Sequence, residues 1–84
     1  MTLEKIRTQI NKIDRQILEK LNQRMHLSLQ TRKFKSKIRD LKREPQVLDQ
    51  IKQKAEDYDL IEKKFAERIF NKIIRESRKI QQNK

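Results

Sequence analysis

The sequence contains no cysteine, no glycine and no tryptophan, and its single proline is Pro45. Without cysteine the chain can form neither a disulfide framework nor a thiolate metal site. The lone histidine, His26, cannot build a structural zinc site. We therefore expect no metal centre. The absence of glycine also excludes a glycine-rich loop for binding phosphate or a dinucleotide.

Long apolar runs are missing as well. No stretch approaches the roughly 20 apolar residues that are needed to span a bilayer. The first residues, Met1 to Lys5, lead directly into amphipathic sequence without the apolar core of a signal peptide. We therefore expect a cytoplasmic protein that does not enter a membrane.

Charged residues are abundant and strongly biased to one sign. They make up 42% of the chain, against 33% hydrophobic residues, and 23 Lys and Arg against 12 Asp and Glu give a formal net charge of +11. Such an excess predicts an anionic partner, which could be nucleic acid, a lipid surface or a small acidic metabolite. With 84 residues, the chain is expected to be one domain, residues 1–84. So short and polar a chain is expected to complete its core with a partner subunit.

The apolar residues of the first half recur every three or four positions, which predicts one long helix from about Thr2 to about Ser36. They are Leu3, Ile6, Ile10, Ile13, Ile17 and Leu21. A rod of this length, roughly 50 Å, is too long for such a small globule to cover. We expect a second copy of the rod to bury its apolar stripe, in an intertwined helical homodimer.

Two further helices are predicted, so the fold class is all-α. The second runs from about Arg43 to Glu56, with Pro45 in its first turn, where the missing N–H costs nothing. The third runs from about Leu60 to Gln82, and Asp59 with Glu62 resembles a capping box at its start. Its inward residues are expected to be Ile61, Phe65, Ile69, Phe70, Ile73 and Ile74.

Both long apolar stripes turn polar toward their C-terminal ends. The stripe of the first helix continues as Arg24, Ser28, Thr31 and Lys35, and that of the third continues as Ser77 and Gln81. Because a buried cation without a partner is costly, such a face must meet water, carboxylates or an anionic ligand. The pattern is compatible with two helices that fray into solvent. It is equally compatible with a pocket between helices, lined by Arg24, Lys35, Ser77 and Gln81.

Four stretches of the chain, in order, resemble the all-helical, type II chorismate mutases. The first is the opening Leu3 to Ile17, with its Ile-x-x-Ile-Asp pattern, and the second is Gln23-Arg24 followed by Lys35. The third is Asp40-Leu41-Lys42-Arg43-Glu44 with Val47-Leu48, and the fourth consists of Phe70, Ile73, Ile74, Ser77 and Gln81-Gln82. The link from Lys35 to Asp40 is shorter than is usual in that family. The family rearranges chorismate to prephenate, on the route to phenylalanine and tyrosine, without metal or cofactor.

The resemblance implies a role for each matching residue. Arg24 would bind one carboxylate of the dianionic substrate, and Arg7 would reach in from the other subunit of the homodimer to bind a carboxylate. Lys35 would donate to a carboxylate and to the ether oxygen whose bond breaks, and Gln81 would donate to the same ether oxygen. Glu44 would accept from the ring hydroxyl, with Asp40 nearby, while Arg43 would orient these groups and Ser77 would touch the ring carboxylate.

Other functions stay open at this level. Related enzymes of the same fold remove pyruvate from isochorismate or act on an amino analogue of chorismate. A basic helical dimer that binds nucleic acid would account for the charge of +11 more directly. It is disfavoured because no nucleic-acid-binding motif is present and aromatic residues are only 5% of the chain.

Overall fold

A computed structural model describes residues 1–34 and 41–83. In this part of the chain the fold consists of three α-helices and no strand: α1 (Leu3–Thr31), α2 (Arg43–Ala55) and α3 (Lys63–Asn83). The prediction of an all-α chain with one long, one short and one medium helix is confirmed for these residues. No helix among them is both long enough and apolar enough to cross a membrane.

Helix α1 is a rod of 29 residues, about 43 Å long at the usual rise per residue. It begins as its sequence suggests, because the side chain of Thr2 accepts a 3.2 Å hydrogen bond from the backbone N–H of Lys5. The α-helix ends at Thr31, and one tighter 3₁₀ turn follows at Arg32–Phe34. The remainder of the predicted helix, residues 35 and 36, lies outside the described residues.

Helix α2 begins at Arg43, as predicted, and ends at Ala55, one residue early. Pro45 is the third residue of its first turn. Since the backbone N–H groups of a first turn have no partner within the helix, Pro45 removes no helical hydrogen bond. The side chain of Lys42, which precedes the helix, makes no capping hydrogen bond.

The predicted start of the third helix is wrong by three residues. Helix α3 begins at Lys63, and the N–H of Ala66 donates to the carbonyl of Glu62, so Glu62 and not Asp59 stands at the N-cap position. Leu60 is 87% exposed, and a helical turn there would gain no packing. Instead, a turn from Ala55 to Tyr58 and an ion pair between Lys63 and Glu56 fold the chain back.

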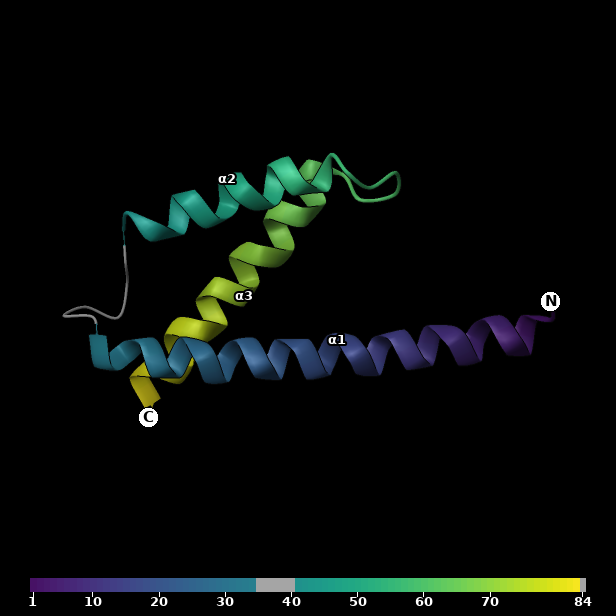
Figure 1. Cartoon of the computed structure of the whole chain (residues 1–84), viewed down its shortest axis with the longest axis horizontal. Coiled ribbons are helices and arrows are strands. Elements are labelled where there is room, and N and C mark those ends of the chain that lie inside the picture. The colour runs from purple at the N-terminus through teal and green to yellow at the C-terminus, as the bar shows by residue number, and fades with distance from the viewer. Residues whose placement is uncertain (35–40, 84) are drawn as a thin grey trace.

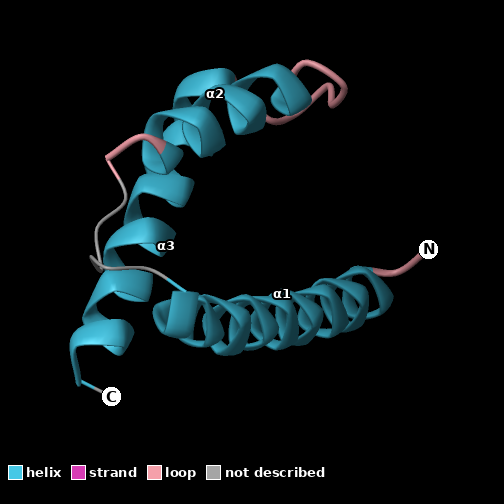
Figure 2. Cartoon of the chain, turned by 60° about the vertical axis from the view of Figure 1, so that its left-hand side comes forward, coloured by secondary structure: helices cyan, strands magenta, loops and turns pink. Residues whose placement is uncertain are grey.

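The three helices leave much of α1 uncovered. Figure 1 shows α3 crossing toward the C-terminal end of α1, with α2 packed on α3, while the N-terminal half of α1 extends alone. Figure 2 shows the same open arrangement from another side. The radius of gyration is 15.6 Å, against about 12 Å for a compact domain of this length.

The apolar core within one chain is correspondingly small. Among the described residues, only Ala55, Ala66 and Ile74 are buried and hydrophobic. The stripe of α1 is open, with Ile10, Ile13 and Ile17 each about half exposed. On α3, Phe65 and Ile69 are exposed too, so the expected inward face is only partly covered by this chain. Burying one such side chain is worth about 1.5–3 kcal/mol, which leaves considerable stability to be gained from a partner.

Candidate active site

A pocket of about 560 Å³ lies where the C-terminal halves of α1 and α3 meet the start of α2. This volume is within the range of sites that hold small molecules. The site is formed by residues far apart in the sequence. The residues that line it are Arg24, Leu27, Ser28, Thr31, Phe34, Arg43, Glu44, Val47, Ile74, Ser77, Arg78 and Gln81.

Two side-chain hydrogen bonds join α1 to α3 at this pocket. The guanidinium of Arg24 donates to the hydroxyl of Ser77 over 2.9 Å, and the amide nitrogen of Gln81 donates to the hydroxyl of Ser28 over 2.8 Å. The two residues of each pair are 53 positions apart in sequence. Arg24 and Ser28 are about one turn apart on α1, as Ser77 and Gln81 are on α3, so the two hydrogen bonds lie one helical turn from each other. The polar ends of the two stripes therefore meet each other in this chain, instead of fraying into solvent.

Ser77 connects the Arg24 guanidinium to the backbone of α3. Its hydroxyl lies 2.9 Å from the carbonyl oxygen of Ile73 and 3.3 Å from the sulfur of Met25. A hydroxyl has one proton, and a carbonyl oxygen is a stronger acceptor than a thioether sulfur. We therefore infer that Ser77 donates its proton to the Ile73 carbonyl. The lone pairs of Ser77 are then free to accept from Arg24, and this orients both groups.

The side chain of Gln81 is only 3% exposed, yet its amide oxygen has no hydrogen-bond partner among residues 1–34 and 41–83. An unpaired buried acceptor costs about 1–3 kcal/mol. Rotating the amide by half a turn would let Ser28 donate to that oxygen, since a hydroxyl both donates and accepts. The amide N–H₂ would then take the place of the unpaired oxygen and could donate to a ligand.

The pocket is electropositive. Burial, and then the positive charge of Arg43, lower the pKa of the Arg24 guanidinium from its ordinary value. Two cations from different helices thus repel each other at the pocket wall. An anion that binds between them would relieve this repulsion, and the planar fork of arginine suits a carboxylate.

Glu44 contributes the negative charge of the lining. It belongs to the first turn of α2, and its carboxylate lies 3.5 Å from the guanidinium of Arg78 on α3. The two side chains are 19% and 23% exposed. This ion pair joins α2 to α3 at the pocket wall.

The structure brings together five of the predicted site residues around this pocket: Arg24, Arg43, Glu44, Ser77 and Gln81. It does not bring Arg7 there. Arg7 lies about 26 Å from Arg24 along the axis of α1, exposed and 3.6 Å from the carboxylate of Glu4. Lys35 and Asp40 lie outside the described residues.

No site role was predicted for Ser28 or Arg78 from the sequence, although both line the pocket. Ser28 could have been found, since it lies on the polar continuation of the α1 stripe, one turn after Arg24. Arg78 gave no such signal, because it lies beside the α3 stripe among many other cations. Its place in the pocket depends on how α2 packs against α3.

A second, more apolar groove lies between α1 and α3, nearer the N-terminal end of each helix. Its volume is about 1030 Å³, and residues of both apolar stripes line it, including Ile13, Ile17, Phe65 and Ile69. Arg24 lines both this groove and the polar pocket. The pocket is therefore continuous with the apolar face that this chain leaves open.

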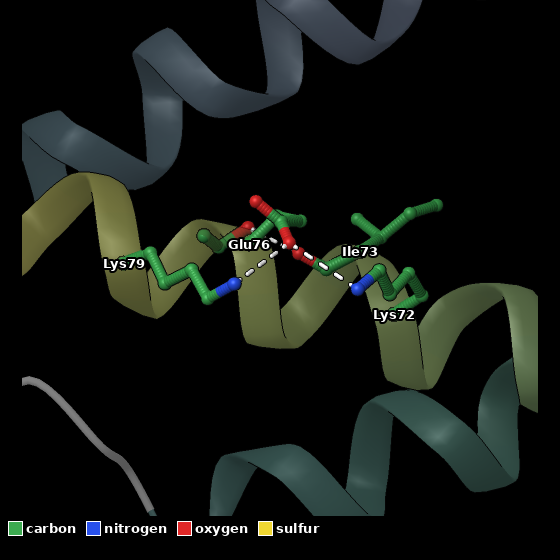
Figure 3. A network of polar contacts seen from close by, with 5 residues as sticks. Lys72, Ile73, Glu76 and Lys79 are labelled. Atoms are coloured by element: carbon green, nitrogen blue, oxygen red, sulfur yellow. Dashed lines mark hydrogen bonds and ion pairs between the residues drawn. The ribbon is translucent and has the colours of Figure 1, made fainter.

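Farther out on α3, a surface network contrasts with the pocket. Glu76 lies between Lys72 and Lys79, at 3.5 and 3.3 Å, as Figure 3 shows. The hydrogen bond from Lys79 and its charge, followed by the contacts with Lys72, lower the pKa of the Glu76 carboxyl, while desolvation opposes the shift. This network neutralises part of the positive charge on α3 and does not line the pocket.

No group of three or more His, Cys, Asp or Glu side chains that could hold a metal ion occurs in residues 1–34 and 41–83. The chemistry available at the described pocket is that of guanidinium groups, hydroxyls, one amide and one carboxylate. These groups can bind and orient an anion and can donate to an oxygen that gains negative charge.

Comparison with known proteins identifies the family. The family model described as chorismate mutase type II matches residues 6–82. The chain therefore belongs to the type II chorismate mutase family. No curated protein and no solved structure gives a significant match.

Proposed function

We propose that this chain is a chorismate mutase, which rearranges chorismate to prephenate in the biosynthesis of phenylalanine and tyrosine. The observation that carries the proposal is the pocket that Arg24, Arg43 and the buried amide of Gln81 line together, with the charge of Arg43 acting on Arg24. Chorismate is a flexible dianion, and its rearrangement is intramolecular. The enzyme must hold the compact reactive shape and stabilise charge on the breaking ether oxygen.

The described residues suit these two tasks. Arg24, fixed by its hydrogen bond to Ser77, would bind one carboxylate through its remaining N–H groups. Ser77 would touch the ring carboxylate. With Ser28 donating to its oxygen, Gln81 would direct its N–H₂ to the ether oxygen. A donor in a water-poor site typically contributes about 10²–10³ in rate when it meets the charge that develops in the transition state.

The α2 side of the pocket would recognise the ring. Glu44 would accept from the ring hydroxyl, and Arg43 would help orient the carboxylates, as the family resemblance implies. Lys35 would be a second donor to the ether oxygen, and Asp40 would lie near the hydroxyl. These last two roles come from the resemblance alone.

We further propose that the working form is a homodimer in which Arg7 of one subunit completes the pocket of the other. The exposed stripe of α1 and the apolar groove beside the pocket support this, because a second copy of α1 would fit both. Arg7 is too far from Arg24 within one chain to share its ligand. The continuity of groove and pocket at Arg24 would bring the partner's helix next to the substrate.

The direct test is the loss of chorismate absorbance with the purified chain and with Arg24→Ala. Arg15→Ala is the matched control, because Arg15 lies on α1 and does not line the pocket. We expect turnover by the wild type and by Arg15→Ala, and a loss of at least about 10²-fold in kcat/KM in Arg24→Ala. Absence of turnover by helical, dimeric wild type would contradict the proposal.

The same assay separates the related activities. Wild type is offered chorismate, isochorismate and the amino analogue of chorismate side by side, and the products are identified by chromatography. We expect the highest kcat/KM for chorismate. Pyruvate release from isochorismate as the main reaction would assign the pocket to the lyase instead. A salt-sensitive gel shift without turnover of any of the three would favour nucleic acid.

A further inference from the structure

The residue that the proposed chemistry leaves unexplained is Arg78. It lines the pocket, and its guanidinium lies 3.5 Å from the Glu44 carboxylate. This ion pair is more protected than the other pair between α2 and α3, Lys52 with Glu67, whose side chains are 38% and 39% exposed at 3.2 Å. A protected ion pair in a substrate pocket needs a reason, because desolvating two charges is costly.

The first reason concerns the orientation of Glu44. This residue stands in the first turn of α2, where the preceding Lys42 makes no side-chain cap. Arg78 follows Ser77 directly on α3, the helix that also supplies Gln81. A contact from Arg78 therefore fixes the Glu44 carboxylate relative to the helix that holds Ser77 and Gln81.

The second reason is charge. A carboxylate that faces a pocket for a dianion repels the ligand, and the repulsion is strong where water is scarce. The described lining carries three cations, Arg24, Arg43 and Arg78, against the one carboxylate of Glu44. Arg78 offsets the charge of Glu44, so that the carboxylate can accept a hydrogen bond without weakening the binding of the anion.

We propose that Arg78 is a positioning residue, which holds the Glu44 carboxylate on the ring hydroxyl of the substrate and neutralises its charge. This inference rests on the proposed function and adds to it the residue that sets recognition of the hydroxyl. It follows that Arg78 acts only through Glu44. Its effect must disappear when the carboxylate is removed, and must shrink when only the hydroxyl is absent, because the uncompensated charge of Glu44 would then be all that remains.

The experiment is a double-mutant cycle with Arg78→Met and Glu44→Gln, read as kcat/KM for chorismate. Arg78→Met keeps the length of the side chain and removes its charge. We expect a loss of about tenfold or more in the single variant, partial recovery in Arg78→Lys, and almost no further loss when Arg78→Met is added to Glu44→Gln. A second substrate, an analogue of chorismate that lacks the ring hydroxyl, should lose clearly less kcat/KM in Arg78→Met than chorismate does, because only the charge effect remains.

Lys52→Met is the matched control, since it breaks the other ion pair between α2 and α3, outside the pocket. Its kcat/KM should remain within about twofold of wild type. If Arg78 only held the helices together, Arg78→Met would lower kcat/KM equally for both substrates, and would lower it as much in Glu44→Gln as in the wild type. Either result overturns the inference. An active wild type with an unaffected Arg78→Met overturns the inference alone, whereas an inactive wild type overturns the proposed function and the inference with it.

Discussion

Arg24 and Ser77 are joined by a 2.9 Å hydrogen bond between α1 and α3, and Ser28 and Gln81 repeat the connection one turn further along both helices. The two helices therefore run in the same direction where they meet. Polar groups occupy the place where the apolar stripes would otherwise continue. These residues line the pocket, and the hydrogen bond to Ser77 orients the guanidinium of Arg24.

Replacing Ser77 tests this hydrogen bond. Ser77→Ala removes an acceptor from the Arg24 guanidinium, and we expect the free energy of unfolding to fall by about 1 kcal/mol and KM for chorismate to rise. Urea unfolding at a fixed protein concentration and steady-state kinetics measure the two effects. Thr8→Ala is the control, because the hydroxyl of Thr8 donates to the carbonyl of Glu4 within exposed α1, away from the pocket. Equal KM values for the two variants would contradict the role of Ser77.

Gln81→Glu tests whether this side chain donates to the substrate. An ionised carboxylate cannot donate and repels a dianion, so activity at neutral pH should fall sharply. Protonation restores a donor at the same place, and activity should therefore rise as the pH is lowered toward the pKa of the new carboxyl. The measurement is kcat/KM against pH. A pH profile of kcat/KM parallel to that of the wild type would contradict the donation of a hydrogen bond from this position to the substrate.

The open face of α1 is tested by a charge placed on it. Ile13→Asp puts a carboxylate in the apolar groove, and we expect it to abolish dimer formation and most of the helical signal at micromolar concentration. Leu18→Asp is the matched control, since Leu18 is 66% exposed and does not line the groove. Light scattering and circular dichroism measure both properties. A dimeric, folded Ile13→Asp would place the interface elsewhere.

The surface network on α3 gives a prediction for pH. Because the folded-state pKa of Glu76 is lowered, its contribution to stability is present above the ordinary glutamate pKa and is lost as the pH falls through the lowered value. An NMR titration of the Glu76 carboxyl should give a higher pKa in Lys79→Met, and a smaller increase in Lys72→Met. Unchanged titration in Lys79→Met would contradict the assignment of the main cause to Lys79.

The helices were predictable because their signals are local. The three- and four-residue spacing from Leu3 to Leu21 identified α1, and the acceptance of proline in a first turn allowed α2 to start at Arg43. The polar continuations of the two stripes were compatible with a pocket that Arg24, Ser77 and Gln81 share, and equally with two frayed ends, so the contact between the helices was needed to decide. The start of α3 was not predictable from Asp59, since the packing of Ala66 and the turn after Ala55 decide it.

Contacts between helices carry no local signal. The pairing of Arg78 with Glu44 depends on the angle at which α3 crosses α2, and no spacing in the sequence encodes it. For Arg7 the reverse holds, because its role was predicted from the sequence and is not seen within one chain. The family resemblance gave it a role across an interface, whereas within one chain it contacts only Glu4 among the partners described. Its role therefore remains a prediction about the dimer.

Mixed dimers of Arg7→Ala and Arg24→Ala test the central claim most directly, because they ask whether two chains share one pocket that converts chorismate. Each variant alone should be nearly inactive. After the two are unfolded and refolded together, random pairing makes about half the dimers mixed, and each mixed dimer has one intact site, so about a quarter of wild-type activity should return. Mixed dimers, verified by mass spectrometry, that show no recovery of chorismate turnover would contradict the account.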